Sequence, residues 1–215
     1  MRASLCVSLI LIAGSASPVV SQDVRSRFLE TCRSEVVAAN PQGAAWADQE
    51  CGDRWTAAMR SNPVADALLL LFKEETAPAR TAAEVRARST PVNWSGPQGR
   101  LGPFVASVEN SDLALNLAWQ AQGEPSPFDV PSALRLRGAQ LTRIGCYGFG
   151  FGEQTHVYRV DLAGHAPFAL TVYSREAPTA SAFSSYSVSA RADRVIPTLA
   201  QLQADPDVEW RPDCG

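Results

Sequence analysis

The residues best suited to acid–base chemistry lie in one stretch of the chain. It holds both histidines, His156 and His165, and Glu153 precedes the first of them by three positions. His156 as a general base would need a nucleophile, and the serines of residues 184–187 are the candidates. No G-x-S-x-G pattern surrounds those serines. The sequence therefore assigns no catalytic residue. A small cofactor-free hydrolase using His156 with Glu153 or a serine of 184–187 is an alternative hypothesis.

Side chains that hold metals or cofactors are sparse. There is no H-E-x-x-H pair, and two disulfides would leave no thiolate in the exported chain. The glycine-rich run that starts at Cys146 lacks the lysine and hydroxyl of a phosphate loop and the spacing of a dinucleotide fold. We therefore expect no metal and no cofactor. The net charge of −3 gives no reason to expect a nucleic-acid partner.

The same glycine-rich run is the strongest candidate for a binding surface. As a strand, it places Tyr147, Phe149 and Phe151 on one face. These rings form either a platform for a sugar or peptide or an aromatic core face. His156 and Arg159, on the next expected strand, complete the candidate set, because aromatic and arginine side chains are enriched in binding surfaces.

The other face of that strand carries Cys146, Gly148, Gly150 and Gly152. Glycine inside a strand often marks the close approach of another segment. We predict that the C-terminal tail lies over these glycines.

The compartment follows from the N-terminus and the cysteines. Residues 1–21 have the pattern of a secretory signal peptide, with Arg2, a short apolar stretch and small residues that place the cut after residue 16 to 21. The apolar stretch is too short to span a bilayer, and no later segment qualifies. Four cysteines follow the signal, so we expect two disulfides in a periplasmic or secreted protein. The favoured pairs are Cys32–Cys51 and Cys146–Cys214, and the crossed pairings stay open.

The periodicity predicts an α+β fold in which helices come first and a sheet follows. Residues 22–72 form a disulfide-linked helical hairpin plus a third helix, so the helical part has two to three helices. Four prolines suggest that residues 73–103 are mostly linker or surface coil, with a helical part around residues 81–88. Residues 104–215 form a mainly antiparallel β domain, a small meander that ends in a short helix or tail. Within it, the alternation over residues 112–119 fits either a helix or a strand, with helix preferred, and residues 133–137 are expected to be extended.

The spacing of Cys32, Cys51 and Trp55 on two successive helices resembles the small helical domains of periplasmic lysozyme inhibitors. The resemblance covers only those two helices and assigns no residue a role. It implies an inhibitor of a cell-wall hydrolase as a second alternative. The leading hypothesis is an exported, non-enzymatic envelope protein that binds a protein or glycan partner. It has no membrane span once the signal is removed, and its oligomeric state is left open.

Overall fold

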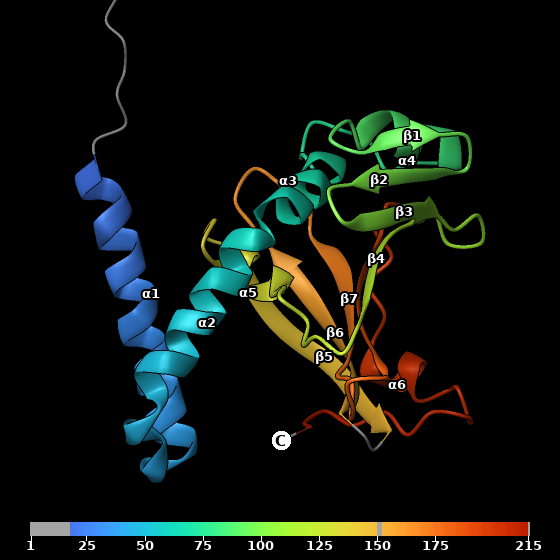
Figure 1. Cartoon of the computed structure of the whole chain (residues 1–215). Helices are drawn as coiled ribbons and strands as arrows, with labels where there is room; N and C mark the ends of the chain where they lie inside the picture. Colours follow the sequence, from blue (N-terminus) through green and yellow to red (C-terminus); the bar gives the residue numbers. More distant parts are fainter. Residues whose placement is uncertain (1–17, 150–151, 215) are drawn as a thin grey trace, which may run out of the picture. The chain divides into compact units, whose positions relative to one another are not determined.

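The computed structural model describes residues 18–149 and 152–214 (Figure 1). Most of the expected signal peptide, residues 1–17, lies outside the described residues. The chain divides into two compact units, residues 1–48 and 49–215. Within the described ranges, no helix combines the length and the apolar character needed to cross a membrane.

Two helical elements make up the described part of the first unit. Helix α1 covers Pro18–Ala39, and the 3₁₀ helix η1 covers Pro41–Ala45. Asn40 separates them, as expected for a residue before proline. Its side-chain Oδ1 accepts a hydrogen bond of 3.0 Å from the Gln42 amide, which caps η1.

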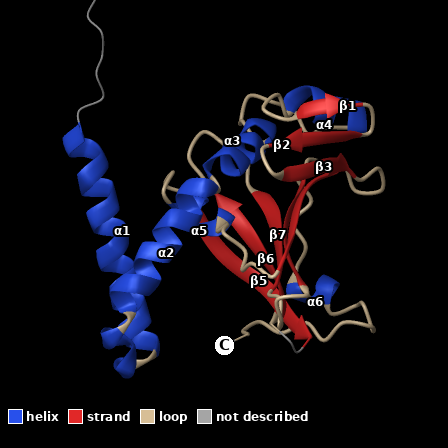
Figure 2. Cartoon of the chain, viewed as in Figure 1, coloured by secondary structure: helices blue, strands red, loops and turns tan. Residues whose placement is uncertain are grey.

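Five further helices are described, and Figure 2 distinguishes them from the strands and loops. They are α2 (Ala47–Arg60), α3 (Asn62–Leu71), α4 (Ala82–Arg88), α5 (Val130–Arg135) and α6 (Leu199–Leu202).

One antiparallel sheet of eight strands organises the second unit, in the order β1-β2-β3-β4-β8-β7-β6-β5. Two four-stranded meanders therefore meet where β4 pairs with β8. The fold is α+β with helices before the sheet, as predicted, but the sheet begins earlier in the chain than expected. Its strands are β1 (Asn93–Ser95), β2 (Gln98–Leu101), β3 (Phe104–Val108), β4 (Ala114–Gln122), β5 (Gln140–Phe149), β6 (Glu153–Asp161), β7 (Phe168–Arg175) and β8 (Phe183–Arg191).

The core lies between the sheet and helices α3 and α5, which cover one of its faces. The apolar side chains of α3, almost all buried, pack there against alternate residues of the central strands. Phe72, just after α3, stacks on Phe168 of β7 with 3.9 Å between ring centroids. We call this side the helix-packed face. The opposite side, the open face, carries the intervening residues of each strand.

Residues 73–103 are not the expected linker or surface coil, although the helical part expected around residues 81–88 is present as α4. Thr81 caps α4 by accepting a hydrogen bond from the Glu84 amide, and Val85 is fully buried. Strands β1 and β2 follow. The prediction of coil was wrong because Pro97 and Pro103 lie in the turns between strands, where proline is common.

Two local predictions are also corrected. Residues 114–119 belong to strand β4, so the alternation of leucines there has the period of a strand and not of a helix. Residues 133–135, expected to be extended, are helical because Asp129 caps α5 and Pro131 occupies its first turn.

Candidate functional site

The C-terminal segment is fastened around β5, the edge strand of the sheet. Cys146 and Cys214 form a disulfide, which is the expected pairing. Cys146 and Arg211 also exchange two backbone hydrogen bonds of 2.8 Å each. Arg143 forms an ion pair with Asp213 at 2.7 Å. We call residues 199–214 the C-terminal clamp, because it occupies part of an edge that would otherwise be free to pair with another chain.

The other two described cysteines, Cys32 and Cys51, are disulfide-bonded as well. Their bond to each other stays a prediction. Disulfides of this kind are compatible with an oxidising extracellular or periplasmic compartment.

The clamp covers a glycine, but not those that were predicted. A Cβ on Gly145 would lie 3.0 Å from Leu199 Cδ1 and 3.2 Å from Leu202 Cδ1, both in α6. Gly148 is exposed, and Gly150 lies outside the described residues. The prediction failed because the clamp crosses the open face and reaches Cys146 around the strand edge. It therefore covers the side of β5 that Cys146 does not face.

Gly152 is exposed too, in the turn before β6, with a φ of +72°. That backbone conformation favours glycine and explains this position without any covering segment.

The five predicted binding residues do not converge. Tyr147 lies on the open face, edge to face with Trp210 of the clamp at 4.5 Å between centroids. Arg159 is on the same face, but its guanidinium is held by Asp161 at 2.9 Å. His156 points to the helix-packed face, opposite to both. The backbone of Phe149 pairs with β6, and Phe151 lies outside the described residues.

His156 has a semi-buried structural environment. Its ring stacks on Tyr158 with 5.9 Å between centroids, and its Nε2 lies 3.2 Å from the Gln154 side-chain oxygen. Burial, and to a lesser degree the charge of Arg143, lowers the pKa of His156. The neutral ring is therefore favoured.

The sheet keeps His156 apart from its proposed catalytic partners. Glu153, Ser185 and Ser187 occupy the open face, on the other side of the strands. Ser184 shares the helix-packed face, but it is fully buried and its hydroxyl accepts a 2.9 Å hydrogen bond from the Ala177 amide. The described residues also contain no group of three or more acidic, histidine or cysteine side chains placed to bind a metal.

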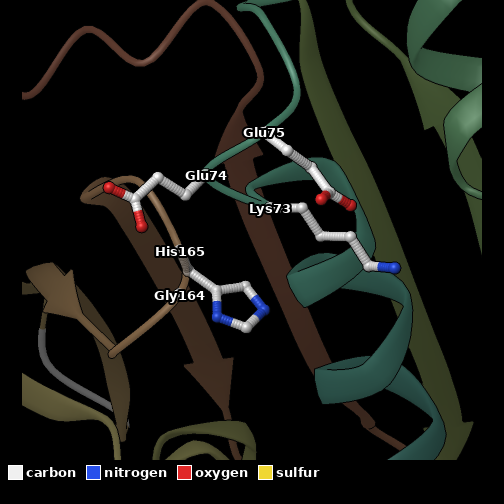
Figure 3. A pocket seen from close by; sticks show the side chains of 5 residues that line it. All are labelled: Lys73, Glu74, Glu75, Gly164 and His165. Atoms are coloured by element: carbon white, nitrogen blue, oxygen red, sulfur yellow. The ribbon is translucent and has the colours of Figure 1, made fainter.

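A hollow of about 500 Å³ lies beside the other histidine (Figure 3). Lys73 and His165 form an isolated backbone bridge there, and the Glu74 amide donates to the Gly164 carbonyl at 3.1 Å. Figure 3 shows the carboxylate of Glu74 pointing away from the Lys73 amine, on the opposite side of the His165 ring. Glu74, His165 and the Lys73 amine therefore do not converge on one point in this hollow.

The open face carries an uninterrupted row of small polar side chains. Five residues occupy successive cross-strand positions on β7, β8, β4, β3 and β2, and each is hydroxyl-bearing or amide-bearing. We call them the hydroxyl–amide row, namely Thr171, Ser189, Asn116, Ser107 and Gln98. All are at least partly exposed. At a strand spacing of about 4.8 Å, the row is roughly 19 Å long.

A second row runs beside the first and has an aromatic end. From β5 it passes through Tyr147, Thr155, Tyr173, Ser187 and Ala118. Burial, and then a hydrogen bond with Glu153, raises the pKa of Tyr173. Thr155 is 4% exposed, and its hydroxyl has no hydrogen-bond partner among the described residues. The β5 end of the open face thus combines two tyrosines with an unsatisfied hydroxyl.

At the opposite end, the open face is hollowed. A depression of about 380 Å³ is lined by Asn93, Ser95, Gln98, Arg100 and Val105 from β1–β3. Amide and hydroxyl groups predominate in it, and Arg100 supplies a positive charge. Its volume falls in the range of small-ligand sites, which is about 300–1,000 Å³.

The sequence alone does not reveal these rows, although part of the signal is local. From Ser184 to Ala190, the side chains that face the core alternate with Ser185, Ser187 and Ser189. The order of strands was needed to bring Asn116 and Thr171 beside them. Comparisons of the chain with models of protein families, with curated proteins and with solved structures found no match.

Proposed function

We propose that this protein is an exported, non-enzymatic envelope protein that binds a protein or glycan partner through the open face of its sheet. The observation that carries the proposal is the hydroxyl–amide row, which presents polar side chains on five adjacent strands. A periplasmic or secreted location is part of the proposal. The disulfides support it, since such bonds persist in oxidising compartments.

Two physical properties make such a face suitable for recognition. Serine, threonine and asparagine have short side chains, so ordering them on binding costs less entropy than ordering lysine or glutamate. Each also offers both a donor and an acceptor. Because the strands hold these groups in a fixed register, the face is organised before the partner arrives.

The test is retention of the protein by envelope material. We expect the mature protein to co-sediment with the envelope fraction of the organism that produces it. The variant Ser187→Arg places a large charged side chain in the middle of the open face and should abolish co-sedimentation. The matched control Ser111→Arg changes an exposed residue in the β3–β4 turn and should behave as the unaltered protein.

Two results would contradict the proposal. One is that the unaltered protein does not co-sediment. The other is that Ser187→Arg and Ser111→Arg co-sediment equally, which would place the binding surface elsewhere on the molecule.

A further inference from the structure

We infer that the occupant of the open face is a glycan chain of N-acetylated amino sugars that lies across the strands along the hydroxyl–amide row. The inference rests on the proposed function and specifies the class of ligand. The open face presents hydroxyl groups beside carboxamide groups in a repeating arrangement.

Carboxamides are the first reason for this class. Asn116 and Gln98 lie in the row, Asn93 lines the hollow at its end, and Gln120 follows Asn116 on the same face of β4. A carboxamide donates and accepts in one plane, so it can pair with the acetamido group of an amino sugar through both functions. The serine and threonine hydroxyls of the rows match the hydroxyl groups of the sugar rings.

The centre of the face also favours a glycan over a protein. Protein interfaces depend on a few large side chains near their centre, most often aromatic residues or arginine. Here the central strands β4 and β8 present Asn116, Ala118, Ser187 and Ser189, which are all small. The more exposed apolar side chains of the face, Val105 of β3 and Phe183 at the start of β8, lie toward its margins.

Charge on the face is nearly balanced, which favours a neutral ligand. Arg159 and Asp161 form an ion pair, and so do Arg191 and Asp193 at 2.7 Å. Arg175 of β7 lies directly across from Glu153 of β6. A polyanion would require an excess of positive side chains along its path. Neutral sugars require only hydrogen bonds and apolar contact.

The two ends of the face define the length of the ligand. At one end, on β7, the partly exposed Tyr173 ring supplies apolar surface beside Thr171, which lies on the same face. The hollow near Arg100 lies at the other end. Beyond β7 the clamp covers the face, because α6 lies over Gly145 of β5. Four strand intervals separate β7 from β2, which is roughly 19 Å. An oligosaccharide of several units is needed to reach both ends, so affinity should rise with chain length.

Isothermal titration calorimetry of the mature, disulfide-bonded protein with N-acetylglucosamine oligomers tests this inference. We expect the hexamer to bind at least about tenfold more tightly than the dimer, because more of the row is engaged. Cellohexaose, which has the same linkage but no acetamido groups, should bind about tenfold more weakly than the N-acetylglucosamine hexamer. Asn116→Ala should weaken hexamer binding about fivefold. The matched control Asn110→Ala, in the turn outside the face, should not.

Several results would overturn the inference. They are no binding of the hexamer, equal affinity for the hexamer and dimer, equal affinity for cellohexaose, or an unaltered affinity in Asn116→Ala. If any of these occurs while Ser187→Arg still abolishes envelope co-sedimentation, the open face is the binding surface but the ligand is of another class, a protein among them. If Ser187→Arg has no effect on co-sedimentation, the proposed function itself fails.

Discussion

Removal of the Cys146–Cys214 disulfide gives the sharpest test of the C-terminal clamp. The bond closes a loop with a sequence separation of 68 residues, for which the chain-entropy model gives about 4.4 kcal/mol at 25 °C. The double variant Cys146→Ala/Cys214→Ala removes it without placing a new polar group at position 146, which is fully buried. We expect the free energy of unfolding to fall by about 4 kcal/mol.

The measurement is a urea titration of the full-length mature chain, followed by near-ultraviolet circular dichroism. Trp210→Ala is the comparison, because it keeps the covalent bond and removes only the ring contact with Tyr147. That contact is worth about 1 kcal/mol beyond the apolar area it buries. A loss below about 1 kcal/mol in the double-cysteine variant would refute the reasoning, since the bond would then restrict the unfolded chain far less than its loop length requires.

The remaining predictions concern packing and pH. Tyr186→Phe should lower the free energy of unfolding by about 1–3 kcal/mol, because the phenol oxygen accepts a 2.9 Å hydrogen bond from the buried first amide of α5; an unchanged urea midpoint would contradict this. The contribution of His156 to the free energy of unfolding should be level above the ordinary histidine pKa of about 6.5 and should fall as pH drops below it, because the folded state holds the pKa of His156 below that of the unfolded chain. His156→Gln should remove this contribution to the pH dependence of the unfolding free energy between pH 7.5 and 5. Identical pH profiles for the variant and the unaltered protein would show that His156 makes no such contribution. Gly145→Ala should destabilise the protein by about 1 kcal/mol because the added methyl group meets α6. Gly52→Ala, in α2 where an added Cβ would meet no other atom, should instead stabilise the protein by about 0.8–1 kcal/mol. If the urea midpoints of Gly145→Ala and Gly52→Ala move in the same direction, the contact between Gly145 and α6 is contradicted.

Local signals predicted much of the fold correctly. The helical stretch that ends at Leu71 and the antiparallel strands within residues 104–215 follow from periodicity. The failures at β1, β2 and α5 share a cause, which is that short elements carry too few residues to establish a period. Strands β1 and β2 have three and four residues, and α5 has six. Their prolines lie in turns and at a helix start, positions that the sequence alone does not distinguish from a linker or an extended chain.

The candidate site was harder to predict because it depends on strand order. The residues chosen from the sequence came from one hairpin, and the side-chain alternation of that hairpin sends His156 to one face and Tyr147 to the other. The hydroxyl–amide row joins residues as far apart as Gln98 and Ser189. Only the β4–β8 pairing brings the two meanders into one surface.

Hydroxyl-radical footprinting is the most direct test of the claim that the open face is the binding surface. Phe183 lies on this face and is 48% exposed, while Met59 of α2 is 43% exposed and lies outside the sheet. In the presence of envelope material, we predict that the oxidation of Phe183 and Tyr173 slows and that the rate at Met59 does not change. Unchanged oxidation of Phe183 and Tyr173, with protection at Met59 alone, would contradict the account.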